Sequence, residues 1–210
     1  MPALSHPLFA RLYHLISPQM EVAGSADHRR EALEGLEGRV IELGAGNGLN
    51  FGHYPSSVTE VVAVEPDPYL RHKAEEAARH APVSVRVLEG DASVLPAGDA
   101  SFDGAVASLV LCSVPDPAGA LAELHRVLRP GGDLRFYEHV RAEQPSSARL
   151  QDAVAPLWAL AAGGCRPNRD TVSAIEAAGF FVEAHRRFRF EPSLLARPVA
   201  PHVIGRARRP

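Results

Sequence analysis

The 210-residue chain is poor in cysteine, methionine and tryptophan, with two, two and one of each. Two cysteines, Cys112 and Cys165, are too few for a disulfide framework, so we expect reduced thiols in a cytoplasmic protein. No apolar run approaches the roughly 20 residues of a membrane-spanning helix. The N-terminus also lacks the pattern of a signal peptide. Stable membrane insertion is therefore not expected.

Charge and short motifs exclude further classes of protein. The formal net charge is −3, so no general attraction to nucleic acid is expected. The sequence contains no C-x-x-C or H-x-x-x-H pairing, which argues against a catalytic metal. It also contains no G-x-S-x-G motif, which argues against a serine hydrolase. The length fits one domain with a full hydrophobic core.

Patterns typical of strands and helices alternate along the chain. The expected strands are Val40–Leu43, Val61–Glu65, Ser84–Glu89, Phe102–Ser108 and Leu134–Tyr137. Pro68–His80 and Pro117–Leu128 are the clearest helices between them. Repeated β-α-β units predict a parallel sheet with helices on both faces. Ligands of such sheets bind beyond the carboxyl ends of the strands, so the residues that follow each strand are the candidates for a site.

A glycine-rich turn follows the first expected strand. Residues 42–48 read Glu-Leu-Gly-Ala-Gly-Asn-Gly, whereas the dinucleotide fingerprint G-x-G-x-x-G would need glycine where Leu49 stands. Glu65 follows Gly46 by 19 residues, at the end of the second strand, where an acid can bind the two hydroxyls of a ribose. The E-x-G-x-G-x-G form resembles motif I of class I methyltransferases that use S-adenosylmethionine (SAM). An NAD(P) site and a purely structural turn are the alternatives.

Later motifs extend this resemblance in the same order. They are AVEPDP (63–68), EGDASVLP (89–96), SFDGAVASLVLCSV (101–114) and LHRVLRPGG (124–132). With the glycine run, they resemble class I SAM-dependent methyltransferases of the ubiquinone-biosynthesis-like type over roughly Arg39 to His139. The resemblance implies one Rossmann-like α/β domain, with a seven-stranded, mostly parallel sheet, helices on both faces and an antiparallel last strand.

Other segments resemble the methyltransferase-like alkyl-thiol methyltransferases. They are the run that ends at Val114, Glu138-His-Val140, Gly164-Cys165 and the run from Arg197 to His202. This resemblance implies S-methylation of a small-molecule thiol, with S-adenosylhomocysteine as the second product. Members of that group carry an N-terminal membrane anchor, which we do not expect here because the chain begins directly with a short helix. O-, N- or C-methylation of a quinone precursor or specialised metabolite, and SAM binding without catalysis, stay open as alternatives.

We expect three functional segments within the one domain. Residues 1–38 would form N-terminal lid helices, 39–139 the SAM-binding core, and 140–210 acceptor-side helices with a C-terminal hairpin. The first helix, Pro7–Ile16, should end at Pro18, and its apolar stripe fits either a lid or a membrane-surface helix. A later helix, Ser147–Ala162, should turn these apolar side chains inward: Leu150, Val154, Leu157, Trp158 and Ala161.

The residues expected to bind SAM follow the strands or belong to the lid. They are Glu42, Gly44, Ala45, Gly46, Asn47, Asn50, Glu65, Pro66, Asp91, Ala92, Ser108 and Leu109, with Tyr13 from the lid. Asp91 would accept a hydrogen bond from the adenine amino group; an Asp turn or helix N-cap is the alternative.

The acceptor side offers one candidate base. His139 follows the fifth strand, and a neutral imidazole can take the proton of a thiol near neutral pH. Glu138 would orient it, although neighbouring strand residues point to opposite faces. The alternative is that His139 only hydrogen-bonds a neighbouring loop. Cys112 is expected to be a small packed residue at the rim of the site, not a nucleophile.

Overall fold

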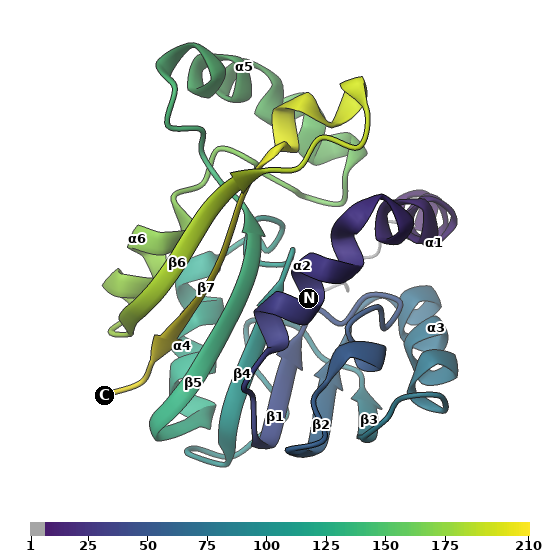
Figure 1. Ribbon diagram of the computed structural model, residues 1–210, viewed down its shortest axis with the longest axis vertical. Coiled ribbons are helices and arrows are strands. Elements are labelled where there is room, and N and C mark those ends of the chain that lie inside the picture. The colour runs from purple at the N-terminus through teal and green to yellow at the C-terminus, as the bar shows by residue number, and fades with distance from the viewer. Residues whose placement is uncertain (1–6) are drawn as a thin grey trace.

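The computed structural model describes residues 7–210, and within them seven strands form one sheet (Figure 1). The order across the sheet is β3 (Ser84–Leu88), β2 (Val58–Val64), β1 (Gly38–Leu43), β4 (Phe102–Ser108), β5 (Leu128–His139), β7 (Pro201–Arg208) and β6 (Phe181–Arg189). β7 runs antiparallel to β5 and β6, and the other neighbouring pairs are parallel. The expected sheet is therefore confirmed. Its strand order reverses between β1 and β4, which is where such sheets bind ligands.

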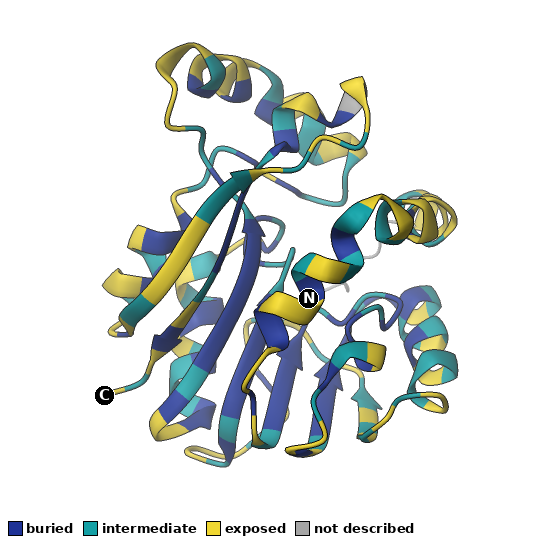
Figure 2. Cartoon of the chain, in the orientation of Figure 1, coloured by how far each residue is buried: buried dark blue, intermediate teal, exposed yellow. Residues whose placement is uncertain are grey.

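Helices cover both faces of the sheet because its strands alternate apolar side chains between the two faces. The covering helices are α2 (Ala26–Leu33), α3 (Pro68–Ala78), α4 (Pro117–Val127) and α6 (Thr171–Ala177). Val40 packs in a cluster with Leu33 of α2, whereas its neighbour Ile41 packs on the other face with Leu124 of α4. The central strands are consequently buried on both sides (Figure 2).

The remaining helices lie above the edge at which the parallel strands end (Figure 1). They are α1 (Pro7–Met20), the π-helical turn η1 (Glu21–Ser25), η2 (Phe51–His53), α5 (Pro145–Ala161) and η3 (Leu194–Val199). Two of the glycine-dependent bends near this edge are at Gly24, between α1 and α2, and at Gly164, after α5. The carboxyl-end edge is thus flanked by elements from both ends of the chain.

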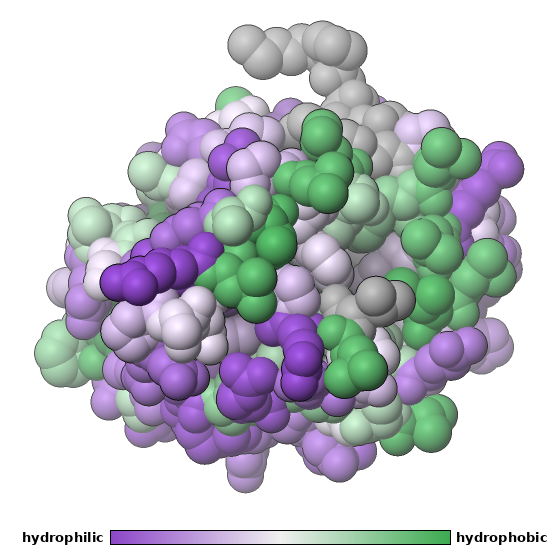
Figure 3. Space-filling view, turned by 90° about the horizontal axis from the view of Figure 1, so that it is seen from above, coloured by the Kyte–Doolittle hydropathy of each residue, from purple (hydrophilic) through white to green (hydrophobic). Residues whose placement is uncertain are grey.

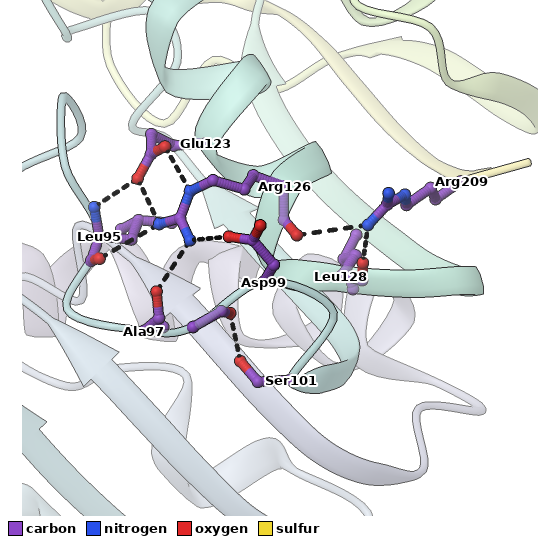
Figure 4. Close-up of polar contacts among 9 residues, drawn as sticks. Leu95, Ala97, Asp99, Ser101, Glu123, Arg126, Leu128 and Arg209 are labelled. Atoms are coloured by element: carbon purple, nitrogen blue, oxygen red, sulfur yellow. Dashed lines mark hydrogen bonds and ion pairs between the residues drawn. The ribbon is translucent and has the colours of Figure 1, made fainter.

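At the opposite edge, Arg126 joins α4 to the loop between β3 and β4 (Figure 4). The Arg126 guanidinium makes two 2.7 Å contacts with Glu123, a third of 2.7 Å with Asp99 and one of 2.9 Å with the Ala97 carbonyl. Glu123 in turn accepts the backbone N–H of Leu95 at 2.8 Å. This network fixes the loop between β3 and β4 against α4.

Two expectations about the helices are wrong. α1 does not end at Pro18 but continues to Met20. Pro18 has no N–H to donate to the His14 carbonyl, and the Ser17 hydroxyl donates to that carbonyl instead, at 3.4 Å. The chain therefore satisfies locally the hydrogen bond that proline removes.

The second correction concerns the orientation of α5. Leu150 and Leu157 were expected to face inward, but they are 52% and 73% exposed, and the buried face carries Gln151 instead. The Gln151 amide donates to the carbonyls of Val140 and Pro167 at 3.1 and 3.0 Å. Because this buried amide has its partners, the polar side chain sets the rotation of the helix.

Candidate functional site

The glycine turn after β1 requires glycine for conformation and for space. Gly44, Gly46 and Gly48 have φ values of 64°, 57° and 82°, in the left-handed region that favours glycine. A methyl group on Gly44 would overlap the Val110 side chain, and one on Gly48 would lie 2.8 Å from the Ala77 methyl. The turn therefore brings the loop after β4 directly against the end of β1.

Glu65 lies against this turn, at the end of β2. Its two carboxylate oxygens accept the N–H groups of Gly46 at 2.8 Å and Asp67 at 2.9 Å. Burial raises the pKa of Glu65 above its usual range, although these two bonds act in the opposite direction. A carboxylate offers about four lone-pair positions, so two stay available for the hydroxyls of a ribose. Pro66, next in the chain, is half-buried, and its carbonyl accepts Arg71 at 3.1 Å.

The Glu42 carboxylate is buried in β1 and accepts hydrogen bonds from Tyr54 Oη at 2.6 Å and Asn50 Nδ2 at 2.8 Å. Burial raises its pKa to about 7, against the lowering effect of these two hydrogen bonds and of Arg29. Both oxygens of Glu42 therefore face protein donors. Its geometry fits the role of orienting Asn50.

Arg29 is a site residue that the sequence did not indicate. It is 95% buried in α2. Its Nη1 lies 3.0 Å from Asn50 Oδ1 and 3.1 Å from Ser108 Oγ, and its Nε forms a 3.0 Å ion pair with Glu21. It thus joins the ends of β1 and β4 through side chains alone. In the sequence, Arg29 is one charged residue of a polar helix. The same pattern is typical of a solvent-exposed helix face, so it does not distinguish Arg29 as a buried residue.

The N-terminal helix α1 contacts the glycine turn. The Tyr13 ring lies 3.5 Å from where a side chain on Gly46 would begin. Asn47 Nδ2 donates to Ser17 Oγ at 2.9 Å and lies 3.2 Å from His14 Nδ1. The Asn47 Oδ1 atom is buried and has no protein partner among the described residues. A buried oxygen of this kind fits a donor on a bound ligand.

The other face of the lid helix points away from the core. Figure 3 views the molecule from above and shows apolar residues gathered on this side. Leu8 and Leu15 of α1 are 86% and 70% exposed. None of the helices within residues 7–210 is long and apolar enough to cross a membrane. The expected stripe therefore exists but faces solvent, and Tyr13 makes its contact from a different side of the helix.

The ends of β3 and β4 carry the remaining candidates. Asp91 Oδ1 accepts the N–H of Ser93 at 2.7 Å, which is the Asp turn named as the alternative; Asp91 is exposed and Ala92 half-buried. Leu109 has a φ of 57°, and its N–H donates to the Tyr137 carbonyl at 2.6 Å. A left-handed leucine stores backbone strain, and such strain concentrates at functional sites.

The two acceptor-side candidates have different surroundings. Glu138 is fully buried, and its carboxylate accepts the N–H groups of Val110, Leu111 and Cys112 at 2.8 to 3.1 Å. It therefore fixes the loop after β4, and its oxygens face that loop and not His139. Burial raises the pKa of Glu138 well above its usual range. His139 is partly exposed at the end of β5, and its Nδ1 lies 3.4 Å from Cys112 Sγ.

Comparisons with known proteins identify the family of this chain. Residues 41–136 match the family model described as "Methyltransferase domain". Thiol S-methyltransferase TMT1B of Homo sapiens is 36% identical over 184 residues, which cover 84% of this chain and 74% of that protein. The Rattus norvegicus protein of the same name is 37% identical over 80% of this chain and 69% of its own length. The chain belongs to the class I SAM-dependent methyltransferases.

A solved structure superposes on nearly the whole length of this chain. A SAM-dependent methyltransferase of Thermotoga maritima, described as a possible histamine N-methyltransferase, superposes with a TM-score of 0.72 and 25% identity. The match covers 96% of this chain and 98% of that one. This protein is therefore an enzyme that uses SAM, and the NAD(P) alternative is excluded.

Proposed function

We propose that this methyltransferase transfers the methyl group of SAM to the sulfur of a small-molecule thiol. The observation that carries the proposal is its similarity to the thiol S-methyltransferases over four-fifths of its length. The residues beyond the ends of β4 and β5, where we expect the acceptor to bind, support it. The segments that follow β4 and β5 place buried Cys112 and Cys165 beside His139, which is a poorly solvated, sulfur-lined environment.

Chain residues can be assigned to each part of SAM. Glu65 would accept hydrogen bonds from the ribose hydroxyls, because its carboxylate keeps two lone-pair positions beside the glycine turn. Arg29 contacts Asn50, which follows this turn, and would bind the carboxylate of the methionine portion. The unpartnered Asn47 oxygen would accept from the amino group. Asp91 and Ala92 stay the candidates for adenine.

Bound SAM supplies a methyl group that its positive sulfonium has already activated. The work of the chain is therefore to bind both reactants, align them and exclude water, which can supply about 7–11 kcal/mol. Tyr13 and its helix would cover the glycine turn from above. Glu138 positions the loop after β4 through three backbone N–H groups. An apolar surrounding favours a reaction in which a thiolate and a sulfonium neutralise each other.

Matched acceptors test this proposal. The purified protein would be incubated with SAM and with butanethiol, butanol or butylamine, and then with thiophenol, phenol or aniline, followed by mass spectrometry. We expect methylation of the thiols, with at least tenfold slower reaction of their oxygen and nitrogen counterparts. Preferred methylation of an oxygen, nitrogen or carbon atom would contradict the thiol assignment. SAM binding without any product would instead indicate a non-catalytic protein.

A further inference from the structure

Three side chains of the kinds that bind metal ions lie together beyond the ends of β4 and β5. Cys112 follows β4, His139 ends β5, and Cys165 lies between α5 and α6. The two sulfur atoms are 3.8 Å apart, and His139 Nδ1 lies 3.4 Å from the sulfur of Cys112 and 3.5 Å from that of Cys165. Both cysteines are free and buried. The residues are 27 and 26 positions apart in the chain, which is why no short motif revealed them.

These distances are those of a tetrahedral zinc site. Zinc binds thiolate sulfur at about 2.3 Å and imidazole nitrogen at about 2.0–2.1 Å. With tetrahedral angles, two such sulfurs lie about 3.8 Å apart, and a sulfur and a nitrogen about 3.5–3.6 Å apart. All three distances among Cys112, His139 and Cys165 lie within about 0.2 Å of these values. The three atoms therefore already form one face of a coordination tetrahedron.

The segments that carry these ligands are fixed to each other. Arg166 donates its backbone N–H to the Cys112 carbonyl at 2.7 Å, directly beside Cys165. Gly164 has a φ of 89°, and a side chain there would begin 2.7 Å from the Ser113 carbonyl oxygen, so only glycine allows this approach. Glu138 holds the Cys112 backbone from the other side. Outer contacts of this kind are typical of metal sites.

We propose that Cys112, His139 and Cys165 bind a thiophilic divalent cation of the zinc class, whose fourth coordination position takes the sulfur of the acceptor. Two thiolates and an imidazole select zinc over magnesium or calcium. Three protein ligands with an open position are the arrangement of catalytic zinc, whereas structural sites have four. The part of the proposal that concerns the acceptor rests on the proposed thiol methylation.

The position of the cluster suits this role. Cys112 lies two residues beyond Val110, whose side chain packs against Gly44 of the SAM turn. A cation bound by the cluster would therefore lie beyond the ends of β4 and β5, whereas the SAM turn follows the neighbouring strand β1. Cysteine binds metals as the thiolate, so binding of the cation would release the thiol protons of Cys112 and Cys165.

With such a cation bound, the reaction needs no strong base to remove the proton of the acceptor thiol. A free thiol has a pKa of about 8.5, so only a few per cent is ionised at pH 7. On coordination, the acceptor thiol would release its proton to solvent and stay bound as thiolate. Its sulfur would form a bond to the methyl carbon of SAM as the bond between that carbon and the sulfonium breaks, with the electron pair left on the departing sulfide. The thioether product is a weak ligand and would dissociate. In this scheme His139 is a ligand and not the proton acceptor.

A disulfide between the two cysteines is the main competing use of the pair. It would require the sulfurs to approach from 3.8 Å to about 2.05 Å. It would also leave unexplained why His139 Nδ1 lies nearly equidistant from both sulfurs. A cation accounts for all three positions together.

Metal titration tests the proposal directly. Chelator-treated, reduced protein would be titrated with Zn²⁺ and with Co²⁺, and the bound metal measured by mass spectrometry and absorption. We expect one ion per chain, and intense tetrahedral Co²⁺ bands with thiolate charge transfer. Cys112→Ser, Cys165→Ser and His139→Gln should each weaken binding at least tenfold, whereas His185→Gln, at an exposed position on β6, should not. SAM binding by calorimetry, unchanged in the variants, would show that they fold.

Addition of thiol separates this inference from the proposed function. Butanethiol should change the Co²⁺ spectrum of the wild-type protein, and butanol should not. Metal-free protein that methylates thiols at the full rate would overturn the metal inference and leave thiol methylation intact. An absence of specific binding, or a Cys112–Cys165 disulfide in protein isolated under reducing conditions, would overturn it as well. A metal-loaded protein whose spectrum ignores thiols would overturn the acceptor role.

Discussion

Arg29 Nη1 lies 3.0 Å from Asn50 Oδ1, and this buried hydrogen bond joins the N-terminal helices to the end of β1. Since Asn50 also donates to Glu42, the two residues connect the lid to the innermost acid of the site. The arrangement connects α2 to the end of β1 at the candidate site, in addition to its packing on the sheet.

We therefore predict that Arg29→Met destabilises the protein and weakens SAM binding together. The substitution leaves Glu21 and Asn50 without their buried partner, and breaking such a pair costs about 3–5 kcal/mol. Denaturant unfolding and calorimetry would measure the two effects. Arg30→Met is the matched control, because Arg30 is next in the chain but exposed in a single ion pair with Asp27. Equal effects of the two substitutions would contradict the role of Arg29.

Glu65→Ala should weaken SAM binding by about 1–3 kcal/mol, because it removes charge-assisted hydrogen bonds to the ribose. Calorimetric titration with SAM would give the value. Glu89→Ala is a suitable control, since Glu89 follows the neighbouring strand but is exposed and pairs only with Arg71 among the contacts described. Unchanged affinity in Glu65→Ala would remove the ribose assignment.

The buried Glu42 predicts a dependence of stability on pH. Its pKa of about 7 in the folded protein exceeds its usual value of 4.5, so the folded protein binds its proton more tightly than the unfolded chain. This contribution is complete below pH 4.5 and is lost as the pH rises through about 7. The loss is on the order of 3 kcal/mol. Glu42→Gln should abolish this part of the slope in denaturant unfolding between pH 4.5 and 8; an unchanged slope would show that Glu42 is ionised throughout.

Gly44→Ala should destabilise the fold and reduce SAM binding. A left-handed conformation costs a residue with a side chain about 1–2 kcal/mol, and overlap with Val110 adds to this. Gly98→Ala is the control, because no atom lies within 4 Å of a side chain built there. Thermal unfolding with and without SAM would measure both effects. A variant that unfolds and binds like the wild type would show that the turn can rearrange.

Arg126→Met should lower stability by about 1–3 kcal/mol without changing SAM affinity, since it removes several charge-assisted hydrogen bonds far from the site. Arg86→Met provides the comparison, because Arg86 is more exposed and makes one 3.6 Å ion pair with Glu60. Such surface pairs contribute about 0–1 kcal/mol. If both variants unfold at the same denaturant concentration, the network adds no stability.

The sheet and the cofactor turn could be predicted from the sequence because their signals are local. The run from Val40 to Leu43 is apolar except for Glu42, the glycines need a special conformation, and Glu65 stands at the expected distance along the chain. The strand boundaries shifted by a few residues at most for β1 to β4. β5 began six residues earlier than expected, at Leu128, because the strand continues through the turn residues at its start.

The features that the sequence did not predict depend on contacts between distant segments. Helix α5 contradicted its apolar pattern because the partners of Gln151 lie in three other segments, which periodicity does not reveal. Arg29 had no local signature, since its partners are Glu21, Asn50 and Ser108. The meeting of two cysteines with His139 arises only when the sheet and the loop after α5 are assembled. Such sites require the three-dimensional structure.

The most direct test of the central claim follows the methyl group itself. SAM with a deuterated methyl group would be incubated with the protein and an equimolar mixture of butanethiol, butanol and butylamine, and all products weighed by mass spectrometry. We expect the label on sulfur, with one S-adenosylhomocysteine formed for each S-methyl product. Label on oxygen, nitrogen or carbon alone, or no transfer by protein that binds SAM, would contradict it.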